Sequence, residues 1–159
     1  MRNNMAGTID AQLQELGIEL PVAAAPVANY VPFTITGNLV FVSGQIPFVD
    51  GEIQYPGRLG DDVSVEDGQK AAQLCGLNII AQVKAACGGD LDRVSQVIKL
   101  SGFVNGTPDF TDQALIINGT SDLMFEVFQD KGKHARAAVG CIALPLGAAV
   151  EVDAVFEIA

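Results

Sequence analysis

Two side chains near the C-terminus, Arg136 and Glu151, could do chemistry together. The Arg136 guanidinium is always charged and offers a planar fork of donors that suits a carboxylate. Glu151 lies one residue inside the run 150–158, in which apolar residues alternate with acidic ones. A half-buried glutamate there can move a proton to or from a water molecule. Because Leu-Pro-Leu-Gly separates the two apolar runs, we expect a strand hairpin that brings Arg136 and Glu151 into a small anion site.

Each of these residues also has an ordinary structural interpretation. Arg136 could form an ion pair with a neighbouring carboxylate, and Glu151 could be a solvated strand residue in register with Asp153 and Glu157. His134, the single histidine of the sequence, lies two residues before Arg136 and shares its side if the strand already runs there. It could carry a proton or extend the anion site, or be a polar residue of an interface.

The elements that must position these residues can be read from periodicity and from breakers. We expect a short helix over 9–16 capped by Thr8, a hairpin from 31–35 and 39–42, and an irregular segment or short strand pair over 48–60. A helix over 65–86, a strand over 94–104 and a second helix over 110–128 follow, the last interrupted at Asn118-Gly119. The length fits one domain over 1–159, with 1–24 as an N-terminal helical extension.

This order of elements predicts an α+β fold, with an antiparallel or mixed β-sheet and helices packed on one of its faces. The apolar strand residues exceed what one helical layer can cover, so the other sheet face is expected to be buried between subunits. The residues assigned to that excess are Val139, Cys141, Val150, Val152, Val155 and Phe156.

Charge and composition exclude several classes of protein. Nine Lys+Arg against nineteen Asp+Glu give a formal net charge of −10, which repels polyanions, so nucleic acid is not an expected partner. The three cysteines, Cys75, Cys87 and Cys141, lack the spacing of a disulfide framework or a zinc site, so no metal is expected and a reducing cytoplasm is the simplest location. No apolar run approaches the roughly 18 residues of a membrane span, and no targeting segment is recognised.

A second group of candidate residues lies near the N-terminus. The strand over 39–42 runs into Ser43-Gly44-Gln45, where a glycine lets the backbone approach a ligand and a serine hydroxyl can hydrogen-bond to it. The same three residues could instead form a bulge or turn at the end of a strand. Tyr30, thirteen residues before Ser43, could be a core aromatic residue.

Two ordered motifs carry a resemblance to a known family. The string ARAAVGCIALPLGAAVEVDAVFEI over 135–158 resembles the C-terminal signature of the RidA/YjgF family of imine deaminases. The string APVANYVPFTITGNLVFVSGQIP over 25–47 is similar to its N-terminal signature of a tyrosine, a hairpin and S-G-Q-I-P. The stretch from the start of the first motif to the end of the second, 25–158, covers most of the chain.

The resemblance implies a chorismate-mutase-like fold assembled as a homotrimer, with clefts between neighbouring subunits and without cofactor or metal. It implies a 2-iminobutanoate/2-iminopropanoate deaminase-like hydrolase, which converts 2-imino acids or their enamine tautomers into 2-keto acids and ammonia. Arg136 would bind the substrate carboxylate, and Glu151 would position or activate the water. Backbone groups around Gly44 and Ala138 would hold the imine nitrogen and the water.

The resemblance also assigns three further residues. Tyr30 and Ser43 would line the cleft from one chain while Arg136 comes from the next, and Asn118 is the candidate for a cleft-facing asparagine. Ala138 stands where well-studied deaminases carry a cysteine, two residues after the arginine. This departure, the N-terminal extension and the NGTSDLMFEVF segment point to a distinct branch of the family.

Two other functional classes use some of the same features. A non-catalytic metabolite-binding or regulatory trimer would need the same arginine and cleft as the deaminase. The other class is a nuclease or chaperone-like protein. Some members of the family have been described as endoribonucleases, but the scattered Lys and Arg of this acidic chain form no basic patch of the kind that a nuclease role favours.

Overall fold

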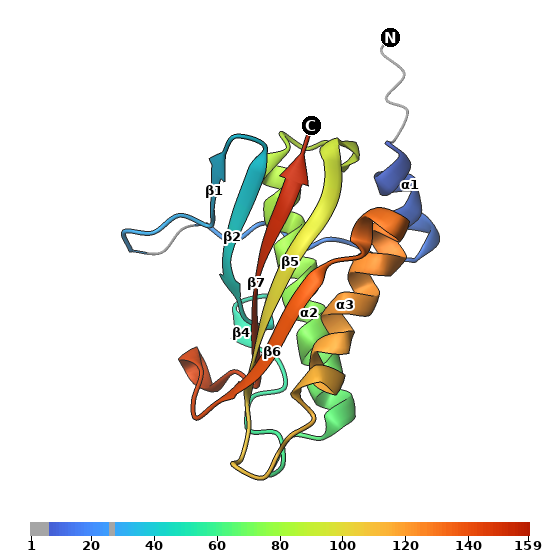
Figure 1. The fold of residues 1–159 in the computed structure, drawn as a ribbon. Helices are drawn as coiled ribbons and strands as arrows, with labels where there is room; N and C mark the ends of the chain where they lie inside the picture. Colours follow the sequence, from blue (N-terminus) through green and yellow to red (C-terminus); the bar gives the residue numbers. More distant parts are fainter. Residues whose placement is uncertain (1–6, 26–27) are drawn as a thin grey trace.

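A single mixed sheet covered on one face by helices forms the body of the protein (Figure 1). The computed structural model describes residues 7–25 and 28–159. In this part of the chain, the main sheet has five strands in the order β1-β2-β7-β5-β6, and a separate two-stranded ribbon pairs β3 with β4. The strands of the main sheet are β1 (Phe33–Thr36), β2 (Leu39–Gln45), β5 (Val94–Asn105), β6 (Ala135–Cys141) and β7 (Val150–Ile158). The expected mixed sheet is confirmed, because β5 and β6 are parallel while the other pairs are antiparallel.

Two long helices, α2 (Val65–Ala86) and α3 (Gln113–Phe128), pack together on the same face of the sheet (Figure 1). Ser64 caps α2, since its hydroxyl oxygen accepts a hydrogen bond from the amide of Asp67 at 3.1 Å. The core lies between these helices and the alternate β7 side chains that face them, from Val150 to Ile158. The expectation of helices on one face is therefore confirmed.

The predicted interruption of the second helix at Asn118-Gly119 is wrong, because α3 is one continuous helix. Gly119 instead meets α2 at close range: a β-carbon placed on Gly119 would overlap the carbonyl oxygen of Gln69. The glycine therefore permits a close contact between two helices, and its small size explains its place in a helix that it would otherwise weaken.

The N-terminal helix α1 (Thr8–Glu15) contacts α3 and the 3₁₀ turn η1 (Leu91–Arg93). Thr8 was expected to cap this helix, but the cap position is Gly7, and the free amides are satisfied from another part of the chain. The Asp92 carboxylate accepts hydrogen bonds from the amides of Thr8 and Ile9, both at 2.8 Å. Of the expected extension over 1–24, residues 1–6 lie outside the described part.

The first hairpin and the irregular segment match the sequence-based prediction. β1 and β2 pair across Gly37-Asn38, and the short strands β3 (Phe48–Val49) and β4 (Glu52–Ile53) form the ribbon expected within 48–60. Further 3₁₀ turns are η2 (Gln129–Gly132) before β6 and η3 (Pro145–Gly147) between β6 and β7. None of the described helices is both long and apolar enough to span a lipid bilayer.

The expected hairpin between the last two strands is wrong. β6 and β7 are consecutive in sequence, but β5 lies between them in the sheet and pairs with both. The helix α3 connects β5 to β6 as a crossover, which is the usual connection between parallel neighbours. Arg136 is consequently one strand removed from β7.

Candidate functional site

Arg136 and Glu151 lie on opposite faces of the sheet within one chain. Arg136 projects from the edge strand β6 toward α3, where its Nη1 donates to Asn118 Oδ1 at 2.9 Å and to Ser121 Oγ at 3.1 Å. Glu151 belongs to the half-buried positions of β7 that alternate with the core-facing ones, so it lies on the face away from the helices. The small anion site expected from a direct Arg136–Glu151 contact does not form within the chain.

The first group of site residues surrounds Arg136 at the edge of the sheet. Asn118, a candidate from the sequence, is in direct contact with Arg136 through the hydrogen bond to Oδ1. His134 and Ala138 share the side of β6 that carries Arg136, and Ala138 packs against the core. Within residues 7–25 and 28–159, no carboxylate lies at ion-pair distance from Arg136. The structural interpretation of Arg136 as half of an ion pair in the chain is therefore wrong.

Ser121 completes this group, and the sequence reasoning missed it. Its hydroxyl lies 3.1 Å from Arg136 Nη1 and 2.9 Å from His134 Nε2. The signal for it was present, because residues three apart in a helix share a face, so a cleft-facing Asn118 implies that Ser121 points the same way.

His134 is held in one orientation by the backbone. Its Nδ1 lies 2.6 Å from the carbonyl oxygen of Gly132, which can only accept, so Nδ1 carries the proton. In the neutral ring, Nε2 is then an acceptor for the hydroxyl hydrogen of Ser121. A directed chain of hydrogen bonds thus runs from Arg136 through Ser121 and His134 to Gly132.

The second group of site residues lies where β2 meets β7. Val42 pairs with Ala154 and Gln45 with Val152, so Ser43 and Gly44 together face a single residue of β7. This is the bulge that the sequence offered as one interpretation of Ser43-Gly44. A β-carbon on Gly44 would overlap Glu151 Oε1, so the glycine makes room for this carboxylate. Gly44 and Glu151 are therefore in contact within one chain.

Tyr30 and Ser43 adjoin this second group. Ser43 Oγ donates a 2.7 Å hydrogen bond to the carbonyl oxygen of Val31, the residue after Tyr30. The Tyr30 side chain is 58% exposed, so its interpretation as a core aromatic residue is wrong. The hairpin expected from the sequence would have placed Glu151 beside Arg136. In the structure, Glu151 instead lies with Ser43 and Gly44, while Arg136 stands apart with Asn118, Ser121 and His134.

Burial governs the protonation of the groups around Glu151. Burial, and secondarily the negative charge of Asp153, raise the pKa of the Glu151 carboxyl. Burial, and secondarily Glu151, also raise the pKa of the Cys141 thiol, which keeps it protonated. Well-studied deaminases carry a cysteine where this chain has Ala138. Cys141 projects from the other side of β6, so its thiol does not take the place of that cysteine. A carboxylate with a raised pKa, by contrast, is suited to exchange protons with water.

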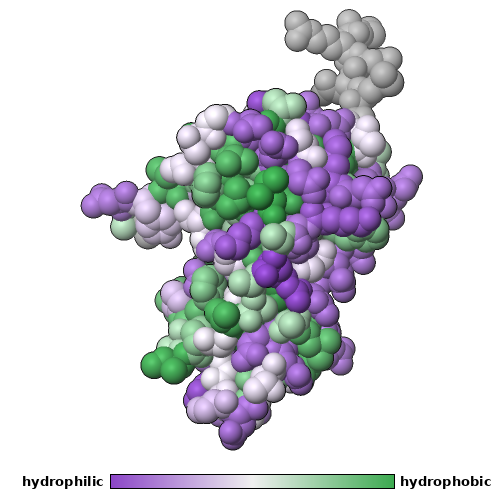
Figure 2. Space-filling view, in the orientation of Figure 1, coloured by the Kyte–Doolittle hydropathy of each residue, from purple (hydrophilic) through white to green (hydrophobic). Residues whose placement is uncertain are grey.

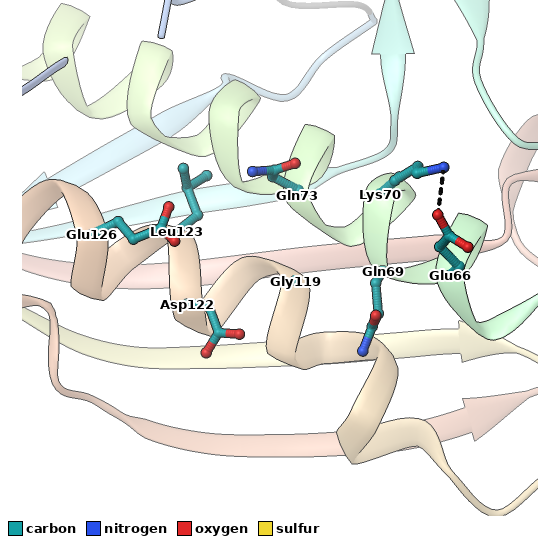
Figure 3. Close-up of a pocket in the computed structure, with 8 residues that line it drawn as sticks. All are labelled: Glu66, Gln69, Lys70, Gln73, Gly119, Asp122, Leu123 and Glu126. Atoms are coloured by element: carbon teal, nitrogen blue, oxygen red, sulfur yellow. Dashed lines mark ion pairs between the residues drawn. The ribbon is translucent and has the colours of Figure 1, made fainter. Parts of the chain in front are cut away.

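A groove between α2 and α3 is less suited to an anionic ligand (Figure 3). Three carboxylates line it, those of Glu66, Asp122 and Glu126, and Lys70 is already paired with Glu66 at 3.2 Å. The excess negative charge would repel a carboxylate, so the Arg136 edge is the better candidate.

The two strand motifs, the mixed sheet and the helix layer are shared with a known family. Residues 10–158 match the model of the family described as "YjgF/chorismate_mutase-like, putative endoribonuclease". The chain belongs to the YjgF/chorismate-mutase-like family. The family resemblance drawn from the two motifs is therefore confirmed, and so is the chorismate-mutase-like α+β fold.

Individual relatives of this YjgF-like chain carry different names. Protein TCP17 of Trypanosoma cruzi is 50% identical over 96% of each chain. A 2-iminobutanoate/2-iminopropanoate deaminase of Dermatophagoides farinae is 30% identical over 89% of this chain and 94% of its own. The crystal structure of Atu1372 from Agrobacterium tumefaciens, a protein of unknown function, is 54% identical with a TM-score of 0.89, over 95% of this chain and 92% of its own.

A more distant YjgF-like structure contains a small molecule. The structure of E. coli TdcF with bound serine is 26% identical to this chain with a TM-score of 0.62, over 86% of this chain and 94% of its own. A member of the family with this fold thus binds an amino acid.

Proposed function

We propose that this protein hydrolyses 2-imino acids, or their enamine tautomers, to 2-keto acids and ammonia in a cleft between the subunits of a homotrimer. The observation that carries the proposal is the state of Arg136, whose guanidinium is half-buried at a sheet edge without a carboxylate partner in the described chain. A guanidinium in this state is suited to bind the carboxylate of a ligand. The relative from Dermatophagoides farinae is named a deaminase, which supports the same reaction class.

In the proposed reaction, Arg136 binds the substrate carboxylate and Glu151 acts on water. The oxygen of the water attacks the imine carbon, while Glu151 accepts a proton from the water and returns it to the nitrogen. Glu151 then takes the hydroxyl proton of the carbinolamine and passes it to the amino nitrogen, the carbon–nitrogen bond breaks, ammonia leaves, and the carbonyl of the 2-keto acid forms. The backbone of the Ser43-Gly44 bulge lies beside Glu151, where it would hold the imine nitrogen.

Assembly is part of the proposal, because a single chain separates the two groups of site residues. Arg136 lies on the edge strand β6, while the group of Glu151, Ser43, Gly44 and Tyr30 lies toward the other edge of the sheet. If the β6 edge of one subunit meets the β1–β2 side of the next, the two groups face each other across the interface. Tyr30, which is exposed in the single chain, would then be covered.

A coupled assay tests the reaction. A threonine or serine dehydratase generates the imine, and the appearance of 2-keto acid is compared with spontaneous hydrolysis. We expect acceleration by the wild type and none by Arg136→Ala. Arg136→Lys should retain only part of it, because an ammonium group cannot form the planar bidentate contact. Lys70→Ala, which removes an exposed cation on α2, is the matched control and should remain active.

The same assay separates the proposal from its alternatives. No acceleration with imines derived from several amino acids would contradict the deaminase activity. If a 2-keto acid still bound, and Arg136→Ala abolished that binding, the chain would be a metabolite-binding trimer, a role compatible with the serine-bound relative. RNA cleavage that survives Arg136→Ala would point to a nuclease, which the net charge of −10 disfavours.

A further inference from the structure

The Arg136 guanidinium is held from one side only. Both hydrogens of Nη1 are directed at α3, one at Asn118 and one at Ser121. Among the residues that the structure describes, neither Nε nor Nη2 of Arg136 has a hydrogen-bond partner. The donors left over, Nε–H and Nη2–H, form the lateral fork of the guanidinium, which matches the two oxygens of a carboxylate.

Ser121 has two ways to use its hydroxyl hydrogen, and they differ in their effect on Arg136. A serine inside a helix commonly donates to a backbone carbonyl of the preceding turn. Here His134 Nε2 lies 2.9 Å from Ser121 Oγ and accepts that hydrogen instead, since its Nδ1–H is engaged with Gly132. The hydroxyl hydrogen then points away from Arg136, and an oxygen lone pair faces Nη1.

We propose that Ser121 and His134 are positioning residues, whose hydrogen-bond chain from Gly132 fixes the guanidinium plane of Arg136 so that its Nε/Nη2 edge receives the substrate carboxylate. The inference rests on the proposed function, in which Arg136 is the carboxylate anchor. Asn118 alone would hold Nη1 at one point and allow the plane to turn. A second bond to Ser121 removes that freedom, and His134 keeps Ser121 in the orientation that accepts.

Binding and kinetics of three variants test the proposal. In Ser121→Ala the dissociation constant of 2-oxobutanoate, used as the probe, and the KM for the imine should each rise about tenfold, as expected for one lost hydrogen bond to a charged group. kcat should change much less, because the anchor binds ground state and transition state alike. Ser121→Thr keeps the hydroxyl and should stay close to wild type. His134→Phe, which frees the Ser121 hydroxyl, should lie between wild type and Ser121→Ala.

A direct readout of the guanidinium distinguishes positioning from general stability. In the free wild-type protein, nuclear magnetic resonance should resolve separate Nη1 and Nη2 signals for Arg136, because two hydrogen bonds slow rotation of the group. In Ser121→Ala these signals should average, while the thermal stability is unchanged or higher, since alanine favours a helix. Ser95→Ala on β5 is the matched control, because Ser95 makes no side-chain hydrogen bond among the described residues. Ser95→Ala should change neither the Arg136 Nη signals nor the thermal stability.

The outcomes separate this inference from the proposed function. If Arg136→Ala abolishes binding of 2-oxobutanoate while Ser121→Ala binds it as the wild type does, the positioning role is overturned and the anchor stands. If Arg136→Ala binds like the wild type, or the wild type does not bind the probe, the anchor itself is overturned. The guanidinium signals then still decide whether Ser121 and His134 hold Arg136, and resolved Nη signals in Ser121→Ala would refute that.

Discussion

Glu151 combines partial burial with a neighbouring negative charge. Burial first, and Asp153 second, raise the pKa of its carboxyl in the folded protein. The folded protein thus binds this proton more tightly than the unfolded chain. Protonated Glu151 therefore stabilises the folded protein. This contribution is fully present below the pKa of an unfolded glutamate, about 4.3, and is lost as the pH rises through the higher pKa of the folded protein.

Glu151→Gln is therefore expected to unfold at a higher temperature than the wild type at pH 7, because it removes a charge that the folded state disfavours. The gain should shrink as the pH falls toward 4, where the wild-type carboxyl is protonated. Calorimetric melting temperatures at the two pH values measure it. Glu52→Gln, in an exposed position on β4, makes the same change in net charge and should show no comparable gain. A lower melting temperature for Glu151→Gln at pH 7 would refute the prediction.

The contact between α2 and α3 determines where the Arg136 partners lie. Gly119 stands between Asn118 and Ser121 in the sequence, and its lack of a side chain lets α3 approach the carbonyl of Gln69 on α2. Thr120 Oγ1 donates to the carbonyl of Ala72 at 2.6 Å and secures the same contact. The position of α3 over β6 thus depends on Gly119 and Thr120. The same contact therefore also determines where Asn118 and Ser121 lie.

Gly119→Ala should change the stability of the protein in two opposing ways, and the close contact between α2 and α3 determines which of the two is larger. Helix propensity alone would stabilise α3 by about 1 kcal/mol. The added methyl group would overlap the Gln69 carbonyl, and overpacking of this kind costs about 1–3 kcal/mol. We expect a net loss of stability in urea unfolding and weaker 2-keto acid binding. Asp122→Ala, an exposed residue of the same helix, serves as control. If Gly119→Ala were instead more stable than the wild type, the prediction would be wrong, because α2 and α3 could then move apart without a loss of stability.

The sheet face opposite the helices carries apolar side chains that no described element covers. Phe41 and Val139 on this face are 43% and 49% exposed, and Val155 lies beside Phe41 in the neighbouring strand. Figure 2 shows hydrophobic residues gathered on this face over β2 and β7. Three residues expected here from the sequence, Val150, Val152 and Phe156, are instead fully buried under the helices. The remaining patch is typical of an interaction surface, and the proposed trimer would bury it.

Val139→Glu should prevent assembly of the proposed trimer, because it places a charge in the apolar patch. In sedimentation or light scattering, the mass should fall from that of three chains to that of one 16.6 kDa chain. Deaminase activity should disappear with it, since the proposed cleft needs two subunits. Leu115→Glu, at a 43% exposed position on α3, is the control and should assemble normally. A wild type that is monomeric in solution and still active would contradict the intersubunit cleft.

Local patterns in the sequence were sufficient for most of the elements. Ser64 and the glycines after Ala86 delimit α2, and the alternation over 150–158 delimits β7, because capping and side-chain periodicity depend only on near neighbours. The two motifs also identified the family. Arg136 and Glu151 stood out by residue type, and Asn118 was correctly placed on the helix that reaches Arg136.

Tertiary structure alone decided which of these residues meet. Strand order depends on pairings between distant segments, so the sequence did not reveal that β5 separates β6 from β7 and that Arg136 and Glu151 occupy opposite faces. The Leu-Pro-Leu-Gly segment resembles a hairpin turn, but the structure shows that β6 pairs in parallel with β5, with α3 as the crossover connection. The chain of Arg136, Ser121 and His134 likewise exists only because α3 packs over β6.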